Sequence, residues 1–223
     1  MVEEKDTLRR QWSRAGARGA RPLSRTIPGR MYAGSSPGKW TTREIALAGL
    51  FAALTAVAAQ ITIPLPFVPL TLQTLATMLA GAILGGRAGA LSQTAYLLMG
   101  FAGLPVFAGR TGGIQHLFGF TGGYLIGFVL CAWVVGRALE RSSKVTATRG
   151  ILAMAAGILA IYIPGVLVLA VHIGSIPRAV VLGALQFLPA DAIKAVIAVG
   201  IVRGLESRGV RRVIRVRPES RGR

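Results

Sequence analysis

Four long stretches without a single charged side chain constrain the fold of this chain more than any other feature of its sequence. They cover residues 45–86, 88–109, 111–136 and 150–177. Each is at least as long as the roughly 20 apolar residues that one membrane-spanning helix needs. The charged fraction of 15% and the mean hydropathy of +0.57 are also unlike those of an ordinary water-soluble domain. The sequence therefore predicts a membrane protein with several spans.

The apolar stretches have the pattern of helices and not that of barrel strands. Residues 45–60 and 150–163 are apolar on every face, whereas the strands of a membrane barrel alternate over segments of about ten residues. Most of the 29 glycines and 11 prolines lie in the apolar part, where neighbouring helices satisfy the backbone groups that these residues free. We therefore expect an all-α bundle, in which the single cysteine, Cys131, is a small packing residue.

Most of the basic residues lie in three segments, and Arg87, Arg110, Arg178 and Lys194 are the exceptions. Ten lie in residues 1–43, four in 137–149 and eight in 203–223. Because Lys and Arg gather on the cytoplasmic side of a membrane, six spans would place all three segments inside, and only Arg110 and Arg178 in outer loops. The charge pattern predicts six transmembrane helices with both termini in the cytoplasm. The concentration of the net charge of +18 in these segments, rather than over a globular face, also argues against binding of nucleic acid.

The chain divides into three predicted parts. Residues 1–40 lack hydrophobic periodicity and are expected to be a disordered basic arm. Residues 41–206 form the transmembrane domain, and residues 207–223 form a basic cytoplasmic tail. A capping box is expected at Thr41–Glu44. The helices are predicted at about 43–62, 70–86, 88–101, 122–140, 147–169 with a kink at Pro164, and 189–206, with outer loops at 103–121 and at 172–189, the latter with a short helix.

Apart from charges at the cytoplasmic ends of the helices, Asp191 and Lys194 are the only charged residues inside the predicted spans. They stand three residues apart, so they share one face of the last helix. Charges at membrane depth are costly and by default indicate a functional site. The alternative is a structural ion pair, since a carboxylate is also stabilised at a helix N-terminus.

Two patterns of small residues also stand out. The outer segment 103–124 contains glycine pairs, which let backbone approach a ligand closely, next to the hydroxyls of Thr111, Thr121 and Tyr124. Glycine pairs also serve as close helix contacts. The second pattern is a stripe in the first helix, formed by Ala48, Ala52 and Ala56. It permits another helix to approach, although internal packing would use it equally well.

Common catalytic and nucleotide-binding motifs are missing from the sequence. There is no G-x4-G-K-[ST] loop, no H-E-x-x-H and no G-x-S-x-G. His116 and His172 have no carboxylate partner in sequence and are expected to be loop or interface residues. We therefore expect neither an ATPase nor an enzyme, and no metal site.

Five short runs, taken together and in this order, resemble the BioY family, the biotin-binding S components of energy-coupling-factor (ECF) transporters. The runs are Val68–Leu75, Met78–Gly81, Gly103–Phe107, Thr121–Tyr124 and Phe187–Ala195, and the similarity extends over roughly residues 43–205. The resemblance implies a multi-pass protein of the bacterial plasma membrane whose 41–206 domain captures biotin from outside. It also implies partners, namely a transmembrane coupling protein and two ATPases, which alone would use ATP, and no cofactor beyond the transported biotin.

The resemblance also implies a binding site. The family motif Pro-Gly-Asp-x-x-Lys falls on Pro189, Asp191 and Lys194, with Ala190 in place of Gly. Asp191 would accept hydrogen bonds from the ureido ring of biotin, and Lys194 would neutralise Asp191 or meet the biotin carboxylate. A polar residue before a glycine pair falls on Thr111, Gly112 and Gly113, and the apolar part of biotin would lie against Leu104, Phe107 and Tyr124.

The stripe of Ala48, Ala52 and Ala56 resembles the surface by which S components dock on the coupling protein. Two residues depart from the family pattern: Arg110, at a position that is more often small, and Phe120, where Pro is frequent. Arg110 is either a carboxylate partner or a solvated loop charge. Two further functions stay open at this point: an S component for another small vitamin, and a membrane interaction protein whose glycine-rich loops only pack.

Overall fold

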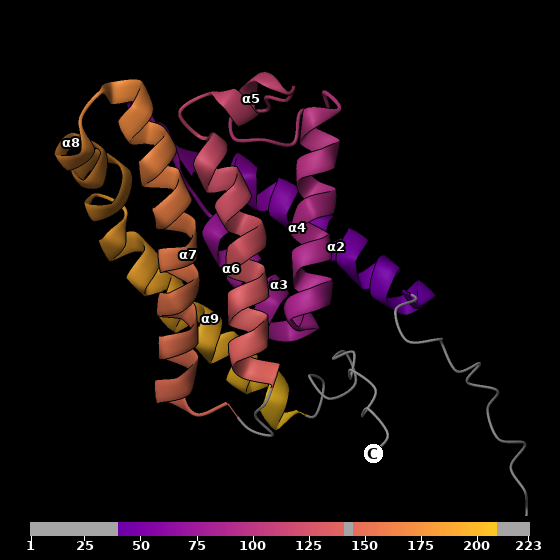
Figure 1. The fold of residues 1–223 in the computed structure, drawn as a ribbon. Coiled ribbons are helices and arrows are strands. Elements are labelled where there is room, and N and C mark those ends of the chain that lie inside the picture. The colour runs from indigo at the N-terminus through magenta and orange to yellow at the C-terminus, as the bar shows by residue number, and fades with distance from the viewer. Residues whose placement is uncertain (1–39, 141–144, 209–223) are drawn as a thin grey trace, which may run out of the picture. The chain divides into compact units, whose positions relative to one another are not determined.

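The computed structural model of the protein describes residues 40–140 and 145–208 (Figure 1). The arm predicted over residues 1–40 and the tail predicted over 207–223 lie almost entirely outside these ranges. The elements are, in order, α2 (Thr42–Gln60), β1 (Thr62–Ile63), β2 (Leu70–Thr71), α3 (Gln73–Leu84), α4 (Gly86–Phe101), α5 (Gln115–Phe118), α6 (Gly122–Glu140), α7 (Ala147–Ile173), α8 (Ile176–Val180), the π-helical turn η1 (Val181–Leu185) and α9 (Leu188–Ser207).

The helical character predicted from the sequence is confirmed, with shifted boundaries. Helix α3 begins at Gln73 and not near residue 70, because Leu70 and Thr71 pair with Ile63 and Thr62 in a short antiparallel ladder. Helix α7 continues through Pro164 to Ile173. The expected outer segment that follows holds α8 and η1.

Four helical stretches in the described residues are long and apolar enough to cross a membrane. They are Thr42–Gln60, Gly122–Glu140, Ala147–Ile173 and the continuous stretch Ile176–Ser207. Helix α3 has 12 residues and α4 has 16, so these two are shorter than a typical single span of about 20 residues. The chain is a membrane protein, and the count of six spans stays a prediction.

The predicted capping box begins α2. The N–H of Glu44 donates to Oγ1 of Thr41 over 3.2 Å, and the N–H of Thr41 donates to Oε2 of Glu44 over 2.7 Å. Such a cap satisfies two backbone donors that a helix start leaves open. It is typically worth about 1 kcal/mol.

Helix α6 has the central position among the helices. It packs against α7, α3 and α4, while α9 packs against α3 and α7. A side-chain carbon at Gly123 would overlap the Pro164 carbonyl, and one at Gly127 would lie 2.7 Å from the Ile161 Cα. These two glycines therefore let α6 approach α7 closely beside Pro164.

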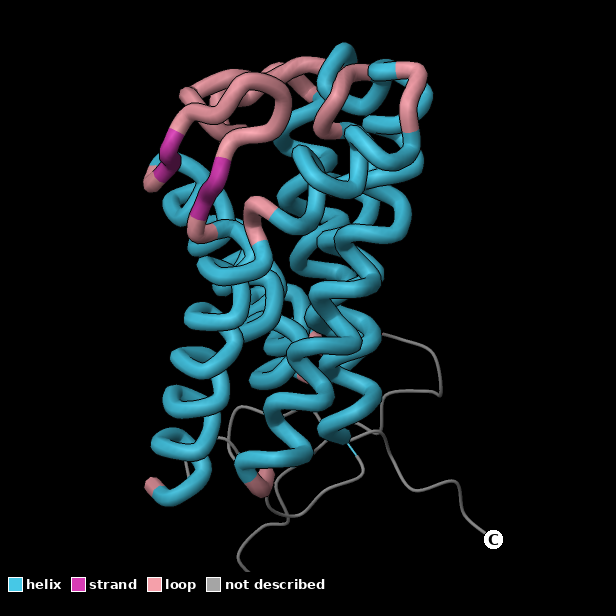
Figure 2. Tube along the Cα trace, turned by 90° about the vertical axis from the view of Figure 1, so that its left-hand side faces the viewer, coloured by secondary structure: helices cyan, strands magenta, loops and turns pink. Residues whose placement is uncertain are grey.

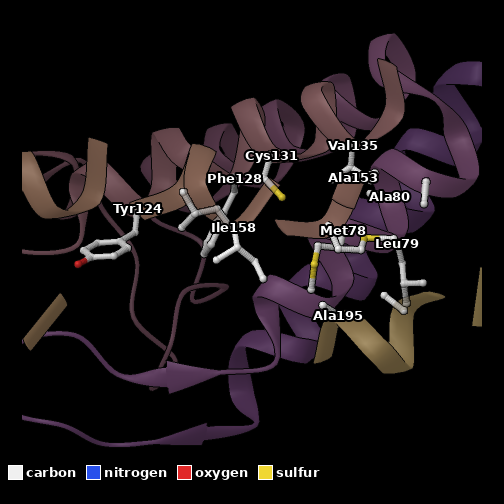
Figure 3. Packing of buried hydrophobic residues seen from close by; sticks show 14 of the residues in the cluster. Met78, Leu79, Ala80, Tyr124, Phe128, Cys131, Val135, Ala153, Ile158 and Ala195 are labelled. Carbon is white, nitrogen blue, oxygen red and sulfur yellow. The ribbon is translucent and has the colours of Figure 1, made fainter. Parts of the chain in front are cut away.

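Apolar side chains fill the space between these helices (Figure 3). Met78, Cys131, Val135 and Met154 are completely buried, and the expectation that Cys131 is a packing residue is confirmed. A polar cluster lies within the same interior. The side chain of Gln93 in α4 accepts a 3.1 Å hydrogen bond from Thr77 in α3 and donates one of 3.1 Å to Thr55 in α2.

The irregular segments gather at one end of the bundle. Figure 1 shows α5 and α8 at this end, and Figure 2 shows the two strands there; this end is uppermost in both views. We call it the loop end. It contains the segments that the sequence analysis expects on the outer side.

Candidate functional site

A cavity of about 240 Å³ lies among the elements of the loop end. Its wall combines residues of β2, α3, the α4–α6 connection, α6, α7 and α9. The lining residues are Val68, Pro69, Leu70, Thr71, Gln73, Thr74, Phe107, Ala108, Thr111, His116, Thr121, Tyr124, Leu125, Phe128, Ile161, Tyr162, Phe187 and Asp191. The wall is mostly apolar with a few polar groups, which is the usual composition of a small-molecule site.

Asp191 is the charged group of this wall. It lies in the first turn of α9, where the helix dipole favours a carboxylate, and only 3% of its surface is exposed. Its Oδ1 accepts a 2.8 Å hydrogen bond from Nζ of Lys194, and its Oδ2 accepts one of 2.7 Å from the Tyr162 hydroxyl. The carboxylate is thus held by one donor on each oxygen.

Lys194 contacts Asp191 but is not among the residues that line the cavity. It is 6% exposed, and its Nζ also donates a 2.7 Å hydrogen bond to the carbonyl of Thr71 in β2. The ion pair therefore connects α9 with the segment that precedes α3. Removal of one partner from a buried pair leaves an uncompensated charge, which typically costs about 3–5 kcal/mol.

A second polar group of the wall is the amide of Gln73, which is 5% exposed. Its Oε1 accepts from the Thr71 hydroxyl over 2.9 Å, and its Nε2 donates to the Tyr96 hydroxyl over 2.5 Å. An amide nitrogen has two N–H groups. The second N–H of Gln73 has no acceptor among the described residues.

The structure brings four of the predicted site residues together on the cavity wall: Asp191, Thr111, Phe107 and Tyr124. Lys194 joins them through Asp191. The Tyr124 hydroxyl is engaged elsewhere, because it donates a 2.8 Å hydrogen bond to the carbonyl of Gly183 in η1.

Leu104, Gly112 and Gly113 are not on this wall. Leu104 is 49% exposed, and Gly112 lies so close to the Leu104 carbonyl that a side chain there would overlap it. Gly113 has a φ of 107°, and its N–H donates to the Gly100 carbonyl over 2.7 Å. In this structure the glycine pair therefore shapes the loop that carries Thr111.

Arg110, which departs from the family pattern, has a strained backbone conformation. Its φ of 59° is the only positive value among the non-glycine residues described, and this conformation costs an L-residue roughly 1–2 kcal/mol. The side-chain Oε1 of Gln60 at the end of α2 accepts from the Arg110 N–H over 3.1 Å. The loop is thereby tied to α2 at its strained residue.

Ala48 and Ala52 do not face outward. They are 2% and 1% exposed, and only Ala56 is partly exposed. Helix α2 packs mainly on α4, so burial supports the packing alternative for this stripe. The outward side of α2 carries a different set of small residues, namely Ala46, Gly49 and Ala53.

Sequence reasoning missed Tyr162, Gln73 and His116 as residues of the wall. Tyr162 could have been found from its position in an apolar span, because a buried phenol hydroxyl usually needs a hydrogen-bond partner. Gln73 had a similar signal, because it is an uncharged polar residue at the start of a predicted span. His116 had none, because only the folded loop places it beside the cavity.

Comparisons with known proteins show the family to which the chain belongs. The model of the BioY family matches residues 32–211. The chain is 41% identical over 170 residues to the biotin transporter BioY of Thermotoga maritima, covering 76% of this chain and 99% of that protein. It is 40% identical over 164 residues to the probable biotin transporter BioY of Pyrococcus horikoshii, covering 74% and 96%.

A solved structure is also similar: the S-component for biotin from an ECF-type ABC transporter. The TM-score is 0.71 and the identity 26%, and the match covers 79% of this chain and 99% of that one. The family model spans most of the chain, and both relatives match it at 40% identity or more over nearly their whole length. This chain therefore belongs to the BioY family.

Proposed function

We propose that the chain captures biotin in the cavity at the loop end and acts as the substrate-specific subunit of an ECF-type ABC transporter. The observation that carries the proposal is the buried carboxylate of Asp191 on the cavity wall, held by Lys194 and Tyr162. The relatives are named as biotin transporters, and the similar structure as an S-component for biotin. The chain is accordingly a transport subunit and not an enzyme.

The chemistry of biotin fits this wall. Its ureido ring presents two N–H donors and one carbonyl acceptor. An ionised carboxylate has about four lone-pair positions, and two of those of Asp191 are occupied by Lys194 and Tyr162. Asp191 can therefore accept from the ureido N–H groups, while the second N–H of Gln73 is a donor for the ureido carbonyl.

Lys194 then has the role of neutralising Asp191. Its ammonium group is engaged by Asp191 and by the Thr71 carbonyl, and Lys194 is not among the residues that line the cavity. The thioether ring and the hydrocarbon chain of biotin would lie against the apolar residues of the wall, among them Leu125, Phe128 and Phe187. Thr111 can still accept from the ligand, because its hydroxyl proton is donated to the Ala108 carbonyl over 3.0 Å.

Transport needs an energy source that this sequence does not encode. The proposal therefore includes a transmembrane coupling protein and two ATPases as partners, a location in the plasma membrane, and six spans with both termini in the cytoplasm. Docking through α2 stays part of the proposal. Since Ala48 and Ala52 are buried, its contact surface would be the outward small residues Ala46, Gly49 and Ala53.

Titration calorimetry on the detergent-solubilised chain, without partners, tests the substrate. We expect saturable one-site binding of biotin and no binding of thiamine. Thiamine binding by folded protein would instead support an S component for another vitamin. Absence of any heat and of any thermal shift would contradict the proposal, because a ligand at 100 times its Kd should stabilise the protein by about 2.7 kcal/mol.

The substitution Asp191→Asn tests whether Asp191 belongs to the biotin site. The substitution keeps the shape of the side chain but removes the charge, and we expect a loss of biotin affinity of about 100-fold. Glu206→Gln is the matched control: Glu206 lies at the other end of α9 and accepts from the Val145 N–H over 2.7 Å. Wild-type affinity in Asp191→Asn would overturn the assignment.

A further inference from the structure

The proposed ligand has one charged group, and the site described so far supplies no partner for it. Biotin carries a carboxylate at the end of its valeryl chain, remote from the ureido ring. Lys194 is engaged by Asp191 and by the Thr71 carbonyl and is not among the lining residues. Among the described residues that line the cavity, His116 has the only side chain that can become a cation.

The His116 ring packs against a neighbouring aromatic ring. His116 lies in α5, half-buried, and its ring packs edge-to-face on Phe107 with 5.3 Å between centroids. Neither ring nitrogen has a hydrogen-bond partner among the described residues. His172 differs in this respect, since its two nitrogens lie 2.9 Å from the carbonyls of Val168 and Phe118.

The exposed fractions of the wall residues indicate how a bound ligand would be oriented. Asp191 is 3% exposed and Tyr162 8%, whereas His116 is half-buried and Thr111 is exposed. The cavity therefore runs from a buried end at Asp191 to a more exposed side at His116 and Thr111. A ligand whose ureido ring reaches Asp191 would present its carboxylate on the more exposed side, where the desolvation cost of an anion is smaller.

We propose that the His116 imidazole donates a hydrogen bond to the carboxylate of the ligand and makes the site selective for the free acid. This inference rests on the proposed function, and it adds a recognition residue for the opposite end of biotin. Neutral histidine has one N–H and its protonated form has two, so the ring supplies a donor in either state. Arg110 is the competing cation of the same loop, but it is not among the residues of the wall.

The test pairs two ligands that differ only at the carboxylate: biotin and biotinamide. A hydrogen bond to a charged group is worth roughly ten- to a hundredfold in affinity, so wild-type protein should prefer biotin at least about tenfold. His116→Phe keeps a ring against Phe107 but removes the N–H. It should weaken biotin binding about tenfold, change biotinamide binding less than about threefold, and so abolish the preference.

His116→Gln restores a neutral N–H donor and should recover part of the preference. If His116→Phe weakens both ligands equally, the residue only packs, and the inference is overturned. It is also overturned if the preference survives in His116→Phe and disappears in Arg110→Gln. Should His116→Phe fail to fold, His116→Gln against His116→Ala measures the same preference, which only the donor-bearing variant should keep.

The same measurements distinguish failure of the proposed function from failure of the role assigned to His116. Wild-type protein that is folded but binds neither ligand would overturn the proposed function and this inference with it. Wild-type protein that binds both ligands with equal affinity keeps the proposed function and overturns only the role of His116.

Discussion

The Tyr162 hydroxyl in α7 donates a 2.7 Å hydrogen bond to Oδ2 of Asp191 in α9. The other oxygen of the carboxylate is held by Lys194 at 2.8 Å. With one donor on each side, the carboxylate plane is fixed before any ligand arrives. A ligand therefore meets an oriented acceptor, and less conformational freedom is lost when it binds.

Tyr162→Phe should weaken biotin binding about three- to tenfold. The substitution removes one hydroxyl and keeps the ring, so Asp191 loses the donor that orients it, while a ligand N–H can occupy part of the freed position. Titration calorimetry measures the change. The control is a double-mutant cycle with Asp191→Asn: an orienting role predicts that Tyr162→Phe adds little in that background, and full additivity would contradict it.

Lys194→Met should destabilise the ligand-free protein by about 3–5 kcal/mol, because it leaves the carboxylate of Asp191 buried without its ion-pair partner. The double variant Asp191→Leu with Lys194→Met should recover most of this loss, since it removes both charges. Thermal unfolding in detergent measures both effects. Equal melting temperatures for the single and double variants would contradict the charge argument. Neither variant should bind biotin with wild-type affinity.

Gln93→Leu should destabilise the protein by about 1–3 kcal/mol. Gln93 is completely buried, and its amide joins Thr77 and Thr55 on two other helices, whose hydroxyls would lose a partner in low dielectric. Thr94→Ala is the matched control, because Thr94 is exposed and bonds only the Ala90 carbonyl within its own helix. A Gln93→Leu protein as stable as Thr94→Ala would contradict the structural role of this cluster.

Local rules of sequence predicted the parts of this molecule that depend on neighbours in the chain. The capping box needs only Thr41 and Glu44, and the pairing of Asp191 with Lys194 needs only their spacing of three residues and the cost of a buried charge. The glycine-rich outer segment drew attention to Thr111 and Tyr124, and the family resemblance assigned them, with Phe107, to the site. These residues do lie on one cavity wall.

Contacts between residues that are far apart in the sequence could not be predicted from those rules. Tyr162 lies 29 residues from Asp191, and Thr71 lies 123 residues from Lys194, so only packing of the helices selects these partners. The alanine stripe shows a related limit. Spacing places Ala48 and Ala52 on one face of α2, but α4 determines that this face is the buried one.

Arg110→Gly should stabilise the protein relative to Arg110→Ala by about 1 kcal/mol. Both substitutions remove the same charge, but alanine keeps the Cβ that is strained at a φ of 59°, whereas glycine adopts this conformation without steric cost. The greater freedom of glycine in the unfolded chain offsets part of the gain. Thermal unfolding of the two variants side by side measures the difference, and the Gln60 hydrogen bond to the residue-110 N–H is available in both. Equal melting temperatures would show that the loop relaxes once the arginine is gone, and that its strain does not limit stability.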